Sequence, residues 1–244
     1  YSFRQPFLIQ PILDDFTKQT GIKTNVVFAK KGLIERVKRE GKHSRADLVL
    51  TSNFSALMQL DDLNLTQKIK SDVVNRNIPV AFRDPAGEWV ALTKRVRNVY
   101  SSKERVGKLA DLGYEDLASA TYKGKICMRS GKHPYNLGLI ASMIAHHGEA
   151  DTKQWLKSVK SNLARKPQGN DRAQVKAVKE GLCDVALGNS YYFGKMLQDS
   201  KQKAWADAVH INFPNQTNRG AHLNVSGVVM TKYAKNPENA LKLI

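Results

Sequence analysis

Short apolar runs of strand length alternate with stretches of helical spacing along most of the 244-residue chain. Strands that alternate with helices in this way are typical of α/β proteins, so the pattern predicts an α/β fold with largely parallel sheets. The four clearest pairs are KTNVVFA (23–29) with KKGLIERVKREG (30–41), ADLVLT (46–51) with SNFSALMQL (52–60), KGKICMRS (123–130) with YNLGLIASMIAHHG (135–148), and CDVALG (183–188) with YYFGKMLQD (191–199).

Two further strand-like runs, LTKRVRNVY (92–100) and LNVSGVVMTK (223–232), have no comparable helix after them. We interpret them as strands that cross between two lobes, which suits the length of the chain. The expected lobes are residues 1–95 plus 229–244 and residues 98–225. The final segment NPENALKLI has helical spacing but stops without a cap, so we expect the first lobe to be incomplete at its C-terminal end.

A pair of tyrosines, Tyr191 and Tyr192, directly follows the strand-like CDVALG. Neighbouring side chains diverge in a regular strand or helix, so the two rings converge only where the backbone turns. Ligands of open α/β sheets bind in loops beyond the carboxyl ends of strands. The loop RSGKHPYN (129–136), which carries Tyr135, has such a position, as does SFRQP (2–6) after an opening strand. In a doubly wound lobe we expect Tyr135 to approach the tyrosine pair.

Three phenols are an unusual but informative donor set. A phenol has a pKa of about 10 and is a poor ligand for most metals, but a small, hard trivalent cation deprotonates its own ligands. Ferric iron is the biological case, and three phenolates would balance its charge. Softer metals prefer histidine or cysteine, which do not cluster in this sequence. An anion would complete the site, held by the backbone N–H groups of Ser130 and Gly131 and by Arg129 or Arg4.

The formal net charge of +17 is evidence about partners and not about fold. It suits nucleic acid, an anionic ligand or an anionic cell surface. The basic residues are scattered, with no arginine-rich arm and no aromatic RNA-binding signature, so we expect no nucleic acid partner. A run of about 20 apolar residues is also missing from the sequence, so we expect no stable membrane insertion.

Enzymatic chemistry finds little support in the sequence. Ser130 is not part of a G-x-S-x-G elbow, and no triad, carboxylate pair or cofactor fingerprint is evident. The segment KPQGNDR (166–172) is most simply a loop that caps the next helix. Cys127 and Cys183 form no C-x-x-C motif and are either two buried thiols or a disulfide between neighbouring strands in an oxidising compartment.

Through nearly its whole length the sequence resembles the periplasmic ferric-iron-binding proteins of bacterial ABC iron importers, a transferrin-like family. The resemblance implies a two-lobed periplasmic binding protein fold of type II, with hinge strands between the lobes. It also implies further helices beyond Ile244. The matching segments are YSFRQP, TGIKTNVVFAKKGLIERVKREG, ADLVLT, GKICMRSGKHPYN, NLARKPQGNDRAQVKAVKEGLCD, GNSYYFGKML, INFPNQTNRGAHLNVSGVVMTK and ENALKLI.

The resemblance also implies the site. Tyr135, Tyr191 and Tyr192 match the tyrosine ligands of the family, and all three belong to the second lobe. A synergistic anion, usually carbonate or phosphate, is held in relatives at positions that match Asn189, Ser130 and Gly131. The residues expected to contact the anion are Arg4, Gln5, Arg95, Arg129, Ser130, Gly131 and Asn189, with Arg97 as an alternative to Arg95.

This sequence departs from some members of the family in the first lobe. Certain relatives supply a histidine and a tyrosine where Gln5 and Pro6 stand here. Others supply a glutamate where Ser52 and Asn53 stand. The first lobe therefore offers no evident metal ligand, and we expect three phenolates and an exogenous anion.

The function implied by the resemblance is capture and delivery, not catalysis. A monomeric periplasmic protein, its signal peptide removed, would bind free or chelated ferric iron with carbonate as the expected anion. It would then deliver the iron to an ABC permease, and protonation of the phenolates or loss of the anion would aid release. A periplasmic location also favours a Cys127–Cys183 disulfide. The main alternative is a protein of the same fold that binds an organic anion or a thiamine-like ligand, with Tyr191 and Tyr192 as stacking groups.

Overall fold

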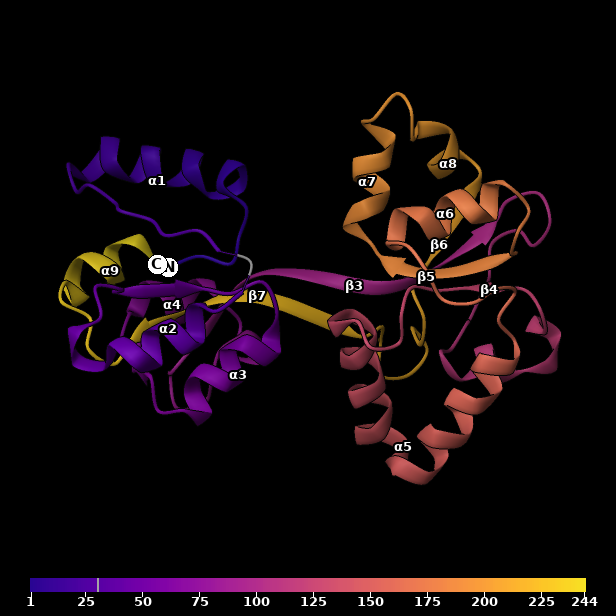
Figure 1. The fold of residues 1–244 in the computed structure, drawn as a ribbon, viewed down its shortest axis with the longest axis horizontal. Coiled ribbons are helices and arrows are strands. Elements are labelled where there is room, and N and C mark those ends of the chain that lie inside the picture. The colour runs from indigo at the N-terminus through magenta and orange to yellow at the C-terminus, as the bar shows by residue number, and fades with distance from the viewer. Residues whose placement is uncertain (30) are drawn as a thin grey trace. The chain divides into compact units, whose positions relative to one another are not determined.

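The computed structural model describes residues 1–29 and 31–244 (Figure 1). The chain divides into two compact units: unit 1 contains Tyr1–Lys94 and Val225–Ile244, and unit 2 contains Arg95–Asn224. The chain passes from one unit to the other within two strands, β3 (Val90–Ser102) and β7 (Leu223–Thr231). These are the two strand-like runs without a helical sequel, so the expectation that they connect two parts of the protein is confirmed.

In unit 1, apolar side chains cover both faces of the sheet. Neighbouring strand residues point to opposite faces, so Val229 packs in a cluster with residues of α2 and α3, and Val228 packs in another with residues of α4 and α9. The elements of this unit besides β3 and β7 are α1 (Pro6–Thr20), α2 (Leu33–Glu40), β1 (Leu48–Leu50), α3 (Phe54–Asp62), β2 (Thr66–Gln67), α4 (Asp72–Asn77) and α9 (Pro237–Leu243), with 3-10 turns at Gly41–His43 and Val80–Phe82.

In unit 2, helices cover both faces of a sheet in which β5 lies between β3 and β4, and β6 pairs with β3 (Figure 1). Leu187 packs with residues of α5 on one face, and Ala186 packs with residues of α6, α7 and α8 on the other. The elements are β4 (Ile126–Cys127), α5 (Pro134–Ser161), α6 (Asp171–Lys179), β5 (Val185–Asn189), α7 (Tyr191–Leu197), α8 (Lys203–Asp207) and β6 (Val209–Asn212), with 3-10 turns at Glu115–Ala118 and Ala120–Tyr122.

The long helix α5 has two arms that meet at a sharp bend (Figure 1). The bend lies at Gly148, whose φ of 78° and ψ of 170° are not helical and suit a residue without a β-carbon. The helix starts at Pro134, because proline needs no hydrogen-bond acceptor at the first helical position. His133 caps this end, accepting the backbone N–H of Tyr135 on Nδ1 at 3.2 Å. Tyr135 therefore stands on the first turn.

The expectation of largely parallel sheets was wrong. β4 and β5 pair in parallel, but β1 and β2 pair antiparallel with β7, and β5 and β6 pair antiparallel with β3. The physical reason is that β3 and β7 have no crossover helix to return the chain in the same direction. Two predicted strands, at residues 23–29 and at the start of the chain, are not regular strands in the structure. They form only isolated bridges, which join Ser2 to Phe28 and to Leu50.

The disulfide that the resemblance favoured is confirmed. Cys127 on β4 and Cys183 just before β5 are bonded, and their Cα atoms lie 5.9 Å apart. Both residues are buried in the cluster beneath α6 and α8. The bond joins the last residue of β4 to the segment that enters β5, and the carboxyl ends of these two neighbouring strands lead to the loops of Tyr135 and Tyr191. Among the described helices, none has the length and hydropathy needed to cross a membrane.

Candidate metal centre

Three tyrosines gather at one edge of the sheet in unit 2. Tyr135 follows the loop after β4, and Tyr191 and Tyr192 begin α7 directly after β5. Since β4 and β5 run parallel, their carboxyl ends share an edge, which brings the two loops together. The hydroxyl oxygens of Tyr135 and Tyr191 lie 3.3 Å apart, and the ring centroids of Tyr191 and Tyr192 are 4.2 Å apart. The turn between β5 and α7 thus allows the tandem rings to lie side by side.

The surroundings of the tyrosine pair favour the neutral phenols. Burial raises the pKa of Tyr191 above its usual value, and hydrogen bonding to Tyr135 and Tyr192 raises it further. Burial also raises the pKa of Tyr192, although its hydrogen bond with Tyr191 opposes this shift. The hydroxyls therefore need a strongly charged partner to become phenolates, and a hard trivalent cation is such a partner.

Four cationic side chains lie over the three tyrosine rings. Positive charge at these rings favours anionic oxygen, either phenolate or a bound anion, in the space beside them. The cations and their distances to ring centroids are Arg95 at 5.5 Å and Arg129 at 5.3 Å from Tyr135, Lys195 at 5.7 Å from Tyr191, and Arg172 at 6.0 Å from Tyr192.

A buried polar network lies directly behind the tyrosines. Arg97, which is 2% exposed, donates to Asp171 Oδ2 at 2.8 Å, to Asn136 Oδ1 at 2.6 Å and to Asn189 Oδ1 at 3.1 Å. Asp171, which is fully buried, also accepts from Arg129 Nη1 at 3.2 Å and from the backbone N–H of Asn189 at 2.9 Å. One carboxylate therefore pairs with two guanidinium groups, which leaves a net positive charge in the network.

The predicted anion-binding residues of unit 2 lie around the same edge. Ser130 is exposed, and its hydroxyl oxygen accepts the backbone N–H of Lys132 at 3.3 Å. Among the described residues other than its two chain neighbours, none has an atom within 4 Å of the point where a β-carbon on Gly131 would stand, which leaves room there for a ligand. The side-chain nitrogen of Asn189 is buried and has no hydrogen-bond partner among the described residues. A buried donor of this kind fits the oxygen of an anion.

Arg4 and Gln5, the other two predicted anion contacts, belong to unit 1. Arg4 donates to the hydroxyl of Ser226 at 2.5 Å, and its backbone N–H donates to the hydroxyl of Ser2 at 3.0 Å. Gln5 is exposed and precedes the first residue of α1. Their role toward the anion stays a prediction.

Sequence reasoning missed most of the network behind the tyrosines. The segment KPQGNDR does cap α6, since Asn170 accepts the backbone N–H of Ala173 at 3.1 Å, as expected. Its Asp171, however, is also the buried partner of Arg97 and Arg129. The sequence carries no signal for this network, because the burial of Asn136, which is 1% exposed, is visible only in the structure.

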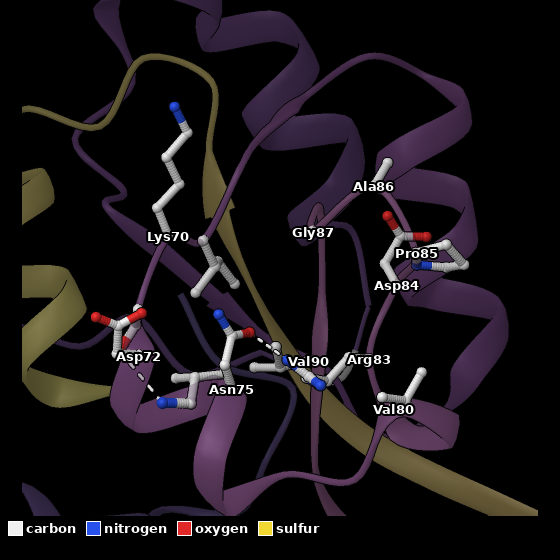
Figure 2. Close-up of a pocket in the computed structure, with 13 residues that line it drawn as sticks. Lys70, Asp72, Asn75, Val80, Arg83, Asp84, Pro85, Ala86, Gly87 and Val90 are labelled. Carbon is white, nitrogen blue, oxygen red and sulfur yellow. Dashed lines mark hydrogen bonds between the residues drawn. The ribbon is translucent and has the colours of Figure 1, made fainter.

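Two larger hollows lie outside the tyrosine cluster. A pocket of about 580 Å³ in unit 1 lies beside α4 and is bordered by Lys70, Asp72, Arg83 and Asp84 (Figure 2). A cavity of about 620 Å³ in unit 2 is lined by apolar residues from both arms of α5, among them Trp155. None of the three tyrosines lines either hollow. Histidine, cysteine, aspartate and glutamate also form no metal-binding group of three within residues 1–29 and 31–244.

Residues 44–244 match the family of bacterial extracellular solute-binding proteins. The chain belongs to this family. Two related proteins are named for iron. Iron uptake protein A1 of Synechocystis sp. is 41% identical over 247 residues, which cover 100% of this chain and 69% of that protein. The major ferric iron-binding protein of Neisseria gonorrhoeae is 31% identical over 245 residues, which cover 96% of this chain and 70% of that protein.

Solved structures of other solute-binding proteins have the same fold. The apo ferric ion-binding protein A of Pasteurella haemolytica is 55% identical with a TM-score of 0.91, and the match covers all of this chain and 76% of that one. A Trichodesmium protein in complex with iron and citrate ligands is 42% identical with a TM-score of 0.94, and the match covers 78% of its chain. The resemblance to periplasmic ferric-iron-binding proteins and the type II binding protein fold are thereby confirmed.

Proposed function

We propose that this solute-binding protein captures ferric iron through the phenolate oxygens of Tyr135, Tyr191 and Tyr192, together with a synergistic anion. The single observation that supports this best is the 3.3 Å separation of the Tyr135 and Tyr191 hydroxyls, which come from two different loops. Two oxygens at this distance can share one metal ion. The adjacent ring of Tyr192 supplies the third donor.

The charges of the site suit this cargo. Three phenolates neutralise the three positive charges of ferric iron, and the burial that keeps the free phenols protonated also strengthens their attraction to the ion. The remaining positions on the metal then accept an anion. The cations over the rings favour an anion on that side, as does the amide nitrogen of Asn189, which has no hydrogen-bond partner in the part of the chain that the structure describes.

Carbonate is the anion that we propose, held by Asn189, Ser130, Gly131, Arg95 and Arg129. The related Trichodesmium structure contains iron with citrate, so citrate is the competitor against which carbonate is tested.

The proposed role is transport in the periplasm. The chain would act as a monomer that carries iron to the permease of an ABC importer and performs no reaction on it. The membership of the chain in the solute-binding family and the names of its iron-binding relatives support this role. The chain spans about 70% of the length of these two relatives.

The decisive experiment is a titration of the purified protein with ferric iron in bicarbonate buffer, followed in the visible spectrum. Ferric phenolate gives a charge-transfer band, so the protein should turn coloured at one iron per chain. Tyr191→Phe should weaken or abolish the band, whereas Tyr233→Phe, at a tyrosine that is 44% exposed in unit 1, should leave it unchanged. A colourless protein that still binds an organic anion would contradict the proposal and favour the alternative.

A further inference from the structure

We propose that Arg97, held by Asp171, is a positioning residue that fixes the two tyrosine loops relative to each other. This inference rests on the proposed function, since positioning has meaning only if the tyrosines share a ligand. Arg97 contacts none of the three hydroxyls in the described hydrogen bonds. It acts instead through the residues beside them.

The first loop is held through Asn136, the residue after Tyr135. Its side-chain oxygen accepts from Arg97 Nη2 at 2.6 Å. Its side-chain nitrogen donates to the backbone oxygens of Arg129 and Ser130, both at 3.1 Å. Asn136 therefore crosslinks the loop that precedes Tyr135 and connects this loop to Arg97.

The second loop is held through Asn189, two residues before Tyr191. Its side-chain oxygen accepts from Arg97 Nη1 at 3.1 Å, and its backbone N–H donates to Asp171 at 2.9 Å. Its carbonyl accepts the hydroxyl of Tyr100 at 2.9 Å. Three separate bonds thus fix the end of β5, from which the tandem tyrosines begin.

A planar guanidinium is needed for this arrangement. Its two terminal nitrogens donate in different, fixed directions, one toward the Tyr135 loop and one toward the Tyr191 loop. The side chains of Arg97 and Asp171 are 1% and 0% exposed, so water cannot replace a lost bond. Asp171 also neutralises the charge of Arg97, which would otherwise be buried unpaired.

The test is Arg97→Lys, which keeps the charge but replaces the fork with a single ammonium group. We expect the iron affinity to fall by about 10–100-fold, as is typical when a group that orients metal ligands is lost. We also expect the charge-transfer band to shift or weaken, because fewer phenolates reach the metal in the right geometry. A purely structural role for Arg97 would lower the unfolding midpoint and leave the band of the folded, iron-saturated protein unchanged.

Arg105→Lys is the matched control. Arg105 lies in the same unit and forms a similar ion pair, donating to Asp184 at 2.7 Å and to the backbone oxygens of Val178 and Cys183. No described contact joins it to either tyrosine loop. This variant should therefore keep the affinity and the band of the unaltered protein, even if it is slightly less stable.

The outcomes separate the two proposals. If the unaltered protein gives no band with iron, the proposed function fails. If it gives the band and folded Arg97→Lys has the same band and affinity, the positioning role is refuted and the proposed function stands. If Arg97→Lys does not fold, Asn136→Ala decides, since it leaves the Arg97–Asp171 pair intact. A shifted band and weaker binding in folded Asn136→Ala support the proposal, and an unaltered band and affinity refute it.

Discussion

The ring of Tyr100 lies against the backbone of Gly188, so closely that a β-carbon at position 188 would stand 2.6 Å from Tyr100 Cε2. Tyr100 is fully buried, and its hydroxyl is bonded to the carbonyl of Asn189. Its ring also stacks on Phe193 at a centroid distance of 6.3 Å. These contacts hold the Tyr100 ring in place. A side chain at position 188 would collide with it, so glycine is needed here for β5 to continue to the tyrosine pair.

Gly188→Ala should therefore destabilise the protein by about 1–3 kcal/mol, the usual cost of overpacking a core. Urea unfolding measures this loss. Gly194→Ala, in α7, is the control, because in the described part of the chain nothing beyond its chain neighbours and its own helix backbone comes within 4 Å of its β-carbon position. Alanine in a helix should there be neutral or stabilising by up to about 1 kcal/mol. Equal effects of the two substitutions would contradict the role of the Tyr100 contact.

Removal of the disulfide should lower stability without removing the fold. The bond closes a loop of 56 positions between Cys127 and Cys183. In the chain-entropy account such a crosslink contributes about 4 kcal/mol by restricting the unfolded chain. The double variant Cys127→Ala, Cys183→Ala should lose about this amount in urea unfolding, and reduction of the unaltered protein should lose a similar amount. No loss in either case would show that the bond adds nothing.

His222 should make stability depend on pH. Burial lowers its pKa to about 4 from an ordinary value of 6.5, and Arg97 and Arg95 lower it as well. The native state thus holds His222 neutral while the unfolded chain takes up a proton. The contribution of neutral His222 to the free energy of unfolding is fully present above pH 6.5. It is lost as the pH falls from 6.5 to about 4, at up to about 1.4 kcal/mol per pH unit.

The measurement for His222 is the free energy of unfolding in urea between pH 7 and pH 4. His222→Gln should flatten the dependence in this window, because glutamine does not titrate. His210→Gln serves as the comparison at a half-buried histidine on β6. If the free energy of unfolding depends on pH equally in His222→Gln and in the unaltered protein, titration of His222 is not the cause.

If iron binds through three phenolates as proposed, an anion should strengthen its binding, because the anion would fill the coordination positions that the phenolates leave open. Bicarbonate-free buffer should weaken the iron affinity about tenfold or more, and citrate should restore it only if it occupies the same place. Ser130→Ala should reduce the benefit of bicarbonate by about fivefold, the effect of one lost hydrogen bond. An iron affinity that is independent of both anions would refute the proposed role of the anion, but not the proposed tyrosine ligands.

Local patterns predicted much of the secondary structure. Helical spacing located α2, α3, α5 and α7, and the apolar runs located β3, β5 and β7. Lys30, the first residue of the predicted helix 30–41, lies outside the described residues. Strand direction was not predictable, because it depends on which strand becomes a neighbour, and residues of similar composition pair either way. The segment 23–29 is half-exposed and gains too little burial to extend a sheet.

The tyrosines and the network behind them differ in how far the sequence predicts them. A tandem pair beyond a buried strand is visible in the sequence, and the chemistry of phenols suggests the ligand. The sequence predicts Arg97 only as an alternative anion contact and Asp171 only as part of a loop that caps a helix, and the two residues are 74 positions apart. Only the fold brings them together in a dry interior, so their role could not be inferred from the sequence.

Unit 2 is one uninterrupted stretch of chain, whereas unit 1 is built from both ends. During synthesis, the tyrosine-bearing stretch leaves the ribosome complete while β1 and β2 still await β7, the strand with which they pair. Unit 2 can thus fold before unit 1, because β1 and β2 lack their partner strand until β7 has emerged.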